Sequence, residues 1–91
     1  MNEQETKVDQ QTAIERDVTV TLNNHAVTFH DHKATGLLIK KTAISQKVLV
    51  QLDFALFEIK GHGQLKQIGD QETVELHKNQ AFRAVAPDDN S

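Results

Sequence analysis

Near the start of the chain, apolar and polar residues alternate on both sides of an asparagine pair, and this pattern constrains the fold more than any other. The alternating apolar residues are Val18, Val20, Leu22, Val27 and Phe29. A period of two is typical of strands with one buried face. Between the two alternating segments lies Asn23-Asn24-His25, whose residues tolerate the positive φ of a tight turn. The sequence therefore predicts a β-hairpin with strands over residues 18–22 and 26–30.

A helical period follows the polar break at residues 31–33. Thr35 is a suitable N-cap for a helix over residues 35–44. The residues that fall on one helical face are Leu38, Ile39, Thr42 and Ala43. This face predicts one short helix that covers a sheet.

The remaining segments indicate three further strands. Residues 48–59 are apolar at both alternating positions, with Phe54 and Leu56 on one side and Phe57 and Ile59 on the other. We expect a strand there with both faces partly occupied. Glycines near positions 61 and 69 are turn signals, and further strands are expected over 73–76 and 81–86.

The predicted order is β-β-α-β-β-β, which has few compact solutions. A hairpin, a crossover helix and a later strand returning beside the first give a mixed α+β sheet with the helix packed on one face. This is the ubiquitin-like β-grasp architecture. The alternative is a small open barrel of SH3 type in which residues 35–44 form a loop. The apolar helical face favours the β-grasp fold.

The length and composition predict one small domain with polar ends. Residues 1–16 carry few apolar side chains, so we expect a flexible leader. Residues 17–86 have ordinary globular composition and form the predicted domain. Residues 87–91 begin with proline and are otherwise polar, so we expect a free C-terminal tail.

Charge and hydropathy narrow the class of partner. Thirteen acidic and ten basic residues give a net charge of -3, which disfavours nucleic-acid binding. A basic patch at Lys40 and Lys41 would suit an acidic ligand, although a solvated helix face is the simpler interpretation. The chain lacks an apolar run near the roughly 20 residues that a membrane span needs, and its start lacks a signal-peptide pattern. We therefore expect a cytoplasmic protein without membrane partners.

The sequence predicts neither an enzyme nor a cofactor. It contains no cysteine, which removes disulfides, thiolate nucleophiles and sulfur-based zinc sites. We find no nucleophile with an orienting base. His30-Asp31-His32 has metal-binding side chains, but neighbours on a strand point to opposite faces. A polar strand end is the simpler interpretation, and we predict no metal site.

Several segments together resemble the bacterial multiubiquitin family, which comprises ubiquitin-like proteins of bacterial conjugation operons. The resemblance covers about residues 17–86, and its motifs are mostly core and turn positions. These segments are Val18-Thr-Val-Thr-Leu22-Asn-Asn, Thr35-Gly36-x-x-Ile39-x-x-x-Ala43, Phe54-x-Leu56, Glu72-Thr-Val74-Glu-Leu76 and Phe82-Arg83.

The resemblance implies a protein modifier. Its expected partners are a ubiquitin-activating-like enzyme, a conjugating-like enzyme, a JAB-type or other processing peptidase, and target proteins. This sequence departs from the family pattern in holding a single domain copy, and it lacks the terminal di-glycine that ubiquitin uses; Asn90 and Ser91 stand there. Either processing exposes an inner residue such as Asn90, or activation tolerates a bulkier terminus, or conjugation is absent. Asn90 and Ser91 are the candidate conjugation terminus.

By analogy with ubiquitin, the sheet face away from the helix should bind partners. If Leu56 and Phe82 point inward, pleat alternation turns Phe57, Arg83 and Val85 outward. The alternative is that Phe57 packs under the 60–68 loop. Two functions follow from this face: a covalent modifier that also uses its terminus, and a non-covalent β-grasp adaptor that does not.

Overall fold

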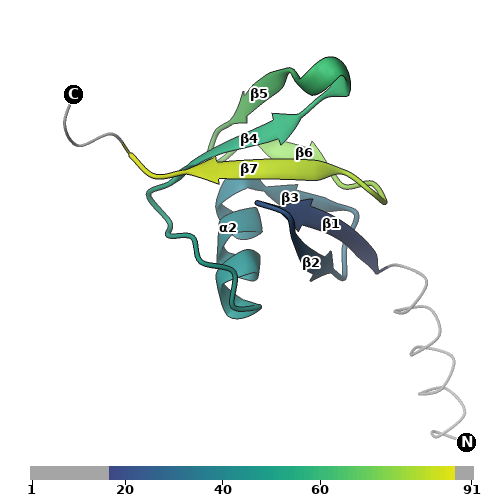
Figure 1. Cartoon of the computed structure of the whole chain (residues 1–91). Helices are drawn as coiled ribbons and strands as arrows, with labels where there is room; N and C mark the ends of the chain where they lie inside the picture. Colours follow the sequence, from purple (N-terminus) through teal and green to yellow (C-terminus); the bar gives the residue numbers. More distant parts are fainter. Residues whose placement is uncertain (1–16, 88–91) are drawn as a thin grey trace, which may run out of the picture.

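The computed structural model of the protein describes residues 17–87, which form a five-stranded mixed sheet with one helix across it (Figure 1). The strand order is β2-β1-β7-β4-β5. The strands are β1 (Val18–Leu22), β2 (His25–Phe29), β4 (Ala55–Ile59), β5 (Leu65–Ile68) and β7 (Ala81–Val85). A separate two-stranded sheet pairs β3 (Lys33–Thr35) with β6 (Thr73–Glu75), and the helices are α2 (Gly36–Ser45) and the short 3-10 helix η1 (Gly61–Gly63).

The predicted hairpin is confirmed. Strands β1 and β2 pair antiparallel, with Leu22 opposite His25, so the loop contains only two residues. Asn23 and Asn24 both adopt positive φ, at 52° and 69°. This is the conformation that a two-residue hairpin turn requires and that asparagine tolerates. His25 begins β2 and does not belong to the turn.

The predicted helix is also confirmed, but it buries a different face. Thr35 is the N-cap, and its Oγ1 accepts a hydrogen bond from Leu38 N at 3.1 Å. Leu38 was expected in the core and is instead 45% exposed. The buried helical residues are Gly36, Ile39, Lys40 and Ala43. The helix is rotated relative to the predicted face because Gly36 and Lys40 pack against the rest of the domain.

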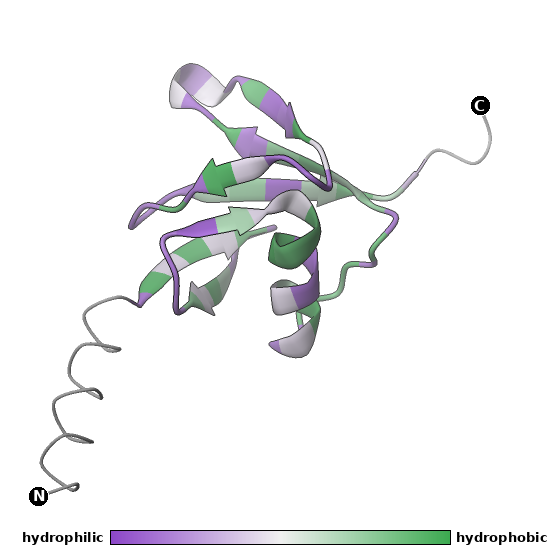
Figure 2. Ribbon diagram, turned by 180° about the vertical axis from the view of Figure 1, so that it is seen from behind, coloured by the Kyte–Doolittle hydropathy of each residue, from purple (hydrophilic) through white to green (hydrophobic). Residues whose placement is uncertain are grey.

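The core lies between α2 and one face of the sheet. Parallel pairing of β1 with β7 brings the first and last strands together, and β4 pairs antiparallel with β7. The helix crosses the sheet on the face seen from behind (Figure 2). The largest fully buried side chains are Phe82, Leu22, Ile39, Leu56, Val20 and Val27. This arrangement is the β-grasp fold, and the formed helix over residues 36–45 excludes the SH3-type alternative.

The strand predicted over residues 48–59 is only half present. Residues 55–59 form β4, whereas residues 48–54 run irregularly beside the helix end. Lys47 has a φ of 73°, which turns the chain out of the helix. Val48 N and Phe54 N then bond to Ala43 O and Gln51 O instead of to a strand. The segment is apolar because its valines enter the core, which is a pattern that a strand also produces.

Two strands, β3 and β5, escaped prediction. Residues 31–33 were expected to be a polar break, yet β3 begins at Lys33 and pairs with β6. The expected 60–68 loop contains η1 and β5. Positive φ at His62 and Gly63 turns the chain so that β5 returns beside β4. Three of the four β5 residues are exposed, so their sequence carries little hydrophobic pattern.

Lys40 contradicts the prediction of a solvated helix face. Its side chain is 3% exposed, and Nζ donates to Leu52 O at 2.7 Å and to Phe54 O at 2.9 Å. Nζ also lies 2.8 Å from Asp70 Oδ1. Lys41, by contrast, is exposed. A buried lysine thus joins the helix to two separate loops.

Within residues 17–87, no helix has the length and hydropathy needed to cross a membrane. The leader expected over residues 1–16 lies outside the described residues, as do positions 88–91 of the expected tail.

Candidate partner-binding face

The sheet face opposite the helix carries a set of neighbouring apolar side chains and one arginine on β4, β5 and β7. Across these strands Ala55 lies opposite Val85, Phe57 opposite Arg83, and Ile59 opposite Ala81. Leu65 of β5 lies opposite Ile59 on the other side. We call these residues the outer-face patch: Ala55, Phe57, Ile59, Leu65, Ala81, Arg83 and Val85.

The three residues predicted for this face share it, as pleat alternation required. Leu56 and Phe82 are each only 1% exposed, so their neighbours along the strands point to the opposite face. Arg83 is exposed, and Val85 is 43% exposed. The cationic group and the aliphatic side chain therefore flank the half-buried Phe57.

Phe57 does not lie under a loop. The segment predicted to cover it forms β5, and Gln67 of β5 pairs beside Phe57 within the sheet. Phe57 is half-buried because side chains on both neighbouring strands flank it. An aromatic ring in this position presents one side to solvent, which is the common state of aromatic anchors at protein interfaces.

Sequence reasoning missed four members of the patch. Ile59 was placed on the same side of its strand as Phe57, and its parity could have identified it. Ala81 and Ala55 follow from the β4–β7 register, which the sequence does not fix. The position of Leu65 could be predicted only if β5 was known, and the short, mostly exposed sequence of β5 gives no strand signal.

A half-buried asparagine fixes β7 against the hairpin turn. Asn23 Oδ1 accepts from Ala84 N at 3.0 Å, and its Nδ2 donates to Ala84 O at 3.2 Å. Asn23 N donates to Phe82 O at 3.0 Å. These bonds extend the short parallel pairing of β1 and β7 toward the C-terminal end of β7. Arg83 and Val85 are therefore held on a strand with little freedom to shift.

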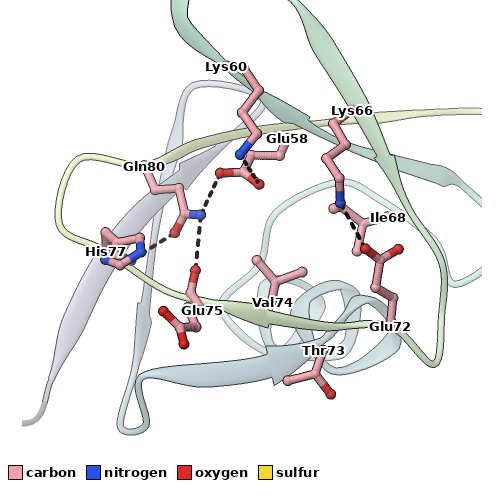
Figure 3. Close-up of a pocket in the computed structure, with 10 residues that line it drawn as sticks. All are labelled: Glu58, Lys60, Lys66, Ile68, Glu72, Thr73, Val74, Glu75, His77 and Gln80. Atoms are coloured by element: carbon pink, nitrogen blue, oxygen red, sulfur yellow. Dashed lines mark hydrogen bonds and ion pairs between the residues drawn. The ribbon is translucent and has the colours of Figure 1, made fainter.

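A polar hollow of about 260 Å³ opens on the helix side, between β4, β5 and β6 (Figure 3). The side chain of Gln80 links β4 to the segment after β6. Its Nε2 donates to Glu58 Oε2 at 2.8 Å and to Glu75 O at 3.1 Å, and its Oε1 accepts from His77 N at 2.8 Å. Lys60 Nζ lies 3.5 Å from Glu58 Oε1. The Glu58 carboxylate is thus paired with both Lys60 and Gln80 inside the hollow.

A second ion pair lies at the far side of the same hollow. Lys66 Nζ is 2.9 Å from Glu72 Oε2, and Gly69 N donates to Glu72 Oε1 at 3.1 Å. The hydrogen bond from Lys66 and the Gly69 amide lower the pKa of Glu72, and the same carboxylate raises the pKa of Lys66. In the described part of the chain no buried side-chain polar atom lacks a partner. The Lys66–Glu72 pair and the Gly69 amide thus hold together the segments around this side of the hollow.

His30 forms an ion pair at the surface. Its Nδ1 lies 2.8 Å from Asp17 Oδ1, and this hydrogen bond, followed by the charge of Asp17, raises the pKa of His30. Among residues 17–87 no three histidine or carboxylate side chains cluster as metal ligands. His30 directly follows the last residue of β2, which agrees with the predicted polar strand end, and its partner Asp17 directly precedes β1.

The His30–Asp17 pair gives a pH prediction. A histidine whose folded pKa is raised stabilises the fold fully below its unfolded pKa of about 6.5 and loses that contribution as pH rises through the folded pKa. We expect the His30 ring resonances to titrate at higher pH in the unsubstituted protein than in Asp17→Asn, because the substitution removes the carboxylate that raises the pKa of His30. An NMR titration of the two proteins checks this; equal His30 midpoints in both would contradict the pair.

The candidate conjugation terminus lies outside the described residues. Asn90 and Ser91 follow Pro87, the last residue that the structure describes. Strand β7 ends at Val85, so the chain leaves the sheet at the edge of the outer-face patch.

Comparison with known proteins agrees with the resemblance seen in the sequence motifs. No curated protein and no solved structure gives a significant match. The family model for multiubiquitin matches residues 18–89, which covers the whole β-grasp sheet from β1 to β7. The chain is therefore a ubiquitin-like protein that belongs to the multiubiquitin family.

Proposed function

We propose that this protein is a bacterial ubiquitin-like modifier that is conjugated to target proteins through its C-terminal carboxylate. The observation that carries the proposal is the outer-face patch on a ubiquitin-like fold. An aromatic ring, an arginine and several aliphatic side chains form a contiguous surface opposite the helix. Residues of these types dominate binding energy at protein interfaces. The patch is the docking surface for the enzymes that handle the chain.

The reacting group in this proposal is the terminal carboxylate at Ser91, or at Asn90 after processing. An activating enzyme joins the carboxylate to a nucleoside triphosphate, forming an acyl-nucleotide and releasing pyrophosphate. A nucleophile then displaces the nucleoside monophosphate, and a conjugating enzyme passes the acyl group to the target. A JAB-type or other peptidase trims or removes the modifier. The modifier supplies the carboxylate and the docking surface and performs no catalysis itself.

A non-covalent adaptor is the second candidate. The outer-face patch does not depend on the terminus, because all its members lie on β4, β5 and β7. In this function a partner binds the patch and no bond forms at the C-terminus. The two functions predict opposite results when the tail is removed.

The test uses the full chain with an N-terminal tag, expressed with the activating and conjugating enzymes encoded beside it. We expect conjugates of higher mass that disappear when residues 87–91 are deleted. Phe57→Asp should reduce conjugates at least about tenfold, because an aspartate at a central anchor removes apolar contact and adds a desolvated charge. A ladder unchanged by tail deletion would refute the covalent function, while a full chain that forms no conjugates but still binds a partner through the outer-face patch would favour the adaptor.

Leu49→Asp is the matched control, because it also exchanges an exposed apolar residue for aspartate. Leu49 is 91% exposed and lies outside the patch, beside the helix end. Since Phe57 is half-buried, its variant is checked for folding by circular dichroism. Arg83→Glu repeats the test at an exposed position. Equal conjugation by Phe57→Asp, Arg83→Glu and Leu49→Asp would show that enzymes do not use the outer-face patch.

A further inference from the structure

The side chain of Gln46 occupies the place of a neighbouring strand at the β2 edge of the sheet. Its Oε1 accepts from Thr28 N at 3.0 Å, and its Nε2 donates to Thr28 O at 2.8 Å. A side-chain amide carries the same donor and acceptor as a peptide group. Gln46 therefore makes with Thr28 the pair of bonds that one residue of an adjacent antiparallel strand would make.

Thr28 is the middle of the three residues that present backbone groups to this edge. In an antiparallel ladder alternate residues direct their N–H and C=O groups to opposite sides. A two-residue hairpin loop makes Leu22 and His25 a hydrogen-bonded pair, so residues 25, 27 and 29 face β1. Ala26, Thr28 and His30 consequently direct their backbone groups outward, and Gln46 covers the central pair.

The end of the helix places Gln46 at this edge. Gln46 is the C-cap of α2, and its N–H donates to Thr42 O at 3.1 Å and to Ala43 O at 3.0 Å. Lys47 then turns the chain away, and Val48 N returns to Ala43 O at 3.0 Å. The backbone on both sides of Gln46 is thus fixed to the last turn of the helix. The amide is held at the strand by this cap.

We propose that Gln46 is a latch that keeps the β2 edge closed to a second copy of this chain. A second copy of the chain fits this edge because an antiparallel strand can pair with the same strand of another copy about a two-fold axis. Two antiparallel β2 strands related by a two-fold axis at Thr28 pair Thr28 with Thr28 of the second copy, and Ala26 with His30. The central hydrogen bonds of that pairing use the same two Thr28 atoms that Gln46 occupies.

Opening the latch leaves the edge in the state that favours sheet extension. Unpaired N–H and C=O groups on an edge strand are a template for another strand. Edge-to-edge pairing joins the two sheets through β2 and leaves β4 and β7, with the outer-face patch, uncovered. The latch therefore controls self-association separately from the proposed enzyme docking.

The test removes the amide while retaining the length of the side chain. Gln46→Met keeps an unbranched side chain but cannot bond to Thr28. We expect this variant to dimerise at least about tenfold more tightly than the unsubstituted chain in sedimentation equilibrium. Gln46→Glu, which keeps the acceptor and loses the donor, should fall between the two, and it provides a second opened variant if Gln46→Met does not fold. A folded, monomeric Gln46→Met together with a monomeric Gln46→Glu would overturn the proposal.

A second substitution identifies the edge that associates. Gln46→Met/Thr28→Lys places two lysines opposite each other across the two-fold axis, where like charges are destabilising. This double variant should return to a monomer, and added salt should restore part of the dimer. Gln46→Met/Thr28→Val is the matched control, because valine is β-branched and uncharged, and it should remain dimeric. Equal dimerisation by both double variants would show that the copies meet elsewhere, for example at β5, and would overturn the proposal.

Discussion

Lys40→Ala is expected to lower the free energy of unfolding by about 3 kcal/mol, through lost packing and through unpaired groups. The substitution removes a side chain that is 3% exposed and frees the carbonyls of Leu52 and Phe54. Asp70 loses its cation too, but it is 55% exposed, so water replaces much of that interaction. Urea unfolding followed by circular dichroism measures the change.

Lys41→Ala is the matched control, because it removes the same side chain from the next position of the helix. Lys41 is exposed, so we expect a change within about 0.5 kcal/mol. Asp70→Asn should cost less than Lys40→Ala, since both carbonyl contacts remain. Similar midpoints for Lys40→Ala and Lys41→Ala would show that the buried ammonium group does not hold the 52–54 loop.

Gly36→Ala is expected to destabilise the fold by about 1–3 kcal/mol, the usual cost of forcing extra volume into a packed site. A Cβ at this position would lie 2.3 Å from Gly69 O and 3.2 Å from Ile68 Cγ2. The backbone cannot yield easily, because Gly36 N donates to Glu72 O and Leu37 N to Asp70 O, both at 3.0 Å. The first turn of α2 is thus seated against the 69–72 turn.

Gly61→Ala makes the same chemical change at a position with open space around it. Within residues 17–87, no atom apart from those of its own stretch of chain lies within 4 Å of its added Cβ. Alanine also has less conformational freedom than glycine in the unfolded chain, so a change near zero or a small gain of stability is expected. Thermal unfolding compares the two variants. If both unfold at the same temperature, close packing of Gly36 against Gly69 is not what requires glycine there.

The hairpin and the helix could be predicted because their signals are local. The Asn23-Asn24 turn, the alternating strands and the Thr35 cap are each contained within a few residues. Strands β3 and β5 could not be predicted this way. Each is three or four residues long, and β3 is paired only with β6, about 40 residues further along the chain. Their strand state depends on the partner and not on their own hydrophobic pattern.

The position of Lys40 was the clearest failure of pattern reasoning. A lysine on a helix is usually solvated, and its burial requires partners that the local sequence does not reveal. Here the partners come from the 52–54 loop and from Asp70, two separate segments that both follow the helix in the sequence. The outer-face patch likewise contains some residues that local sequence predicts and others that it does not. Phe57, Arg83 and Val85 followed from alternation along single strands, whereas Leu65 and Ala81 required the register between strands.

The position of β7 determines when this domain can fold during synthesis. The last strand to leave the ribosome stands in the middle of the sheet, between β1 and β4. Until residues 81–85 emerge, the hairpin and the β4–β5 pair have no strand to join them, and their edges stay open. Such non-local pairing slows folding and exposes unpaired edges to aggregation. A nascent chain stalled before residue 81 should therefore be sensitive to proteases and bound by chaperones, and release of the last strand should end both states.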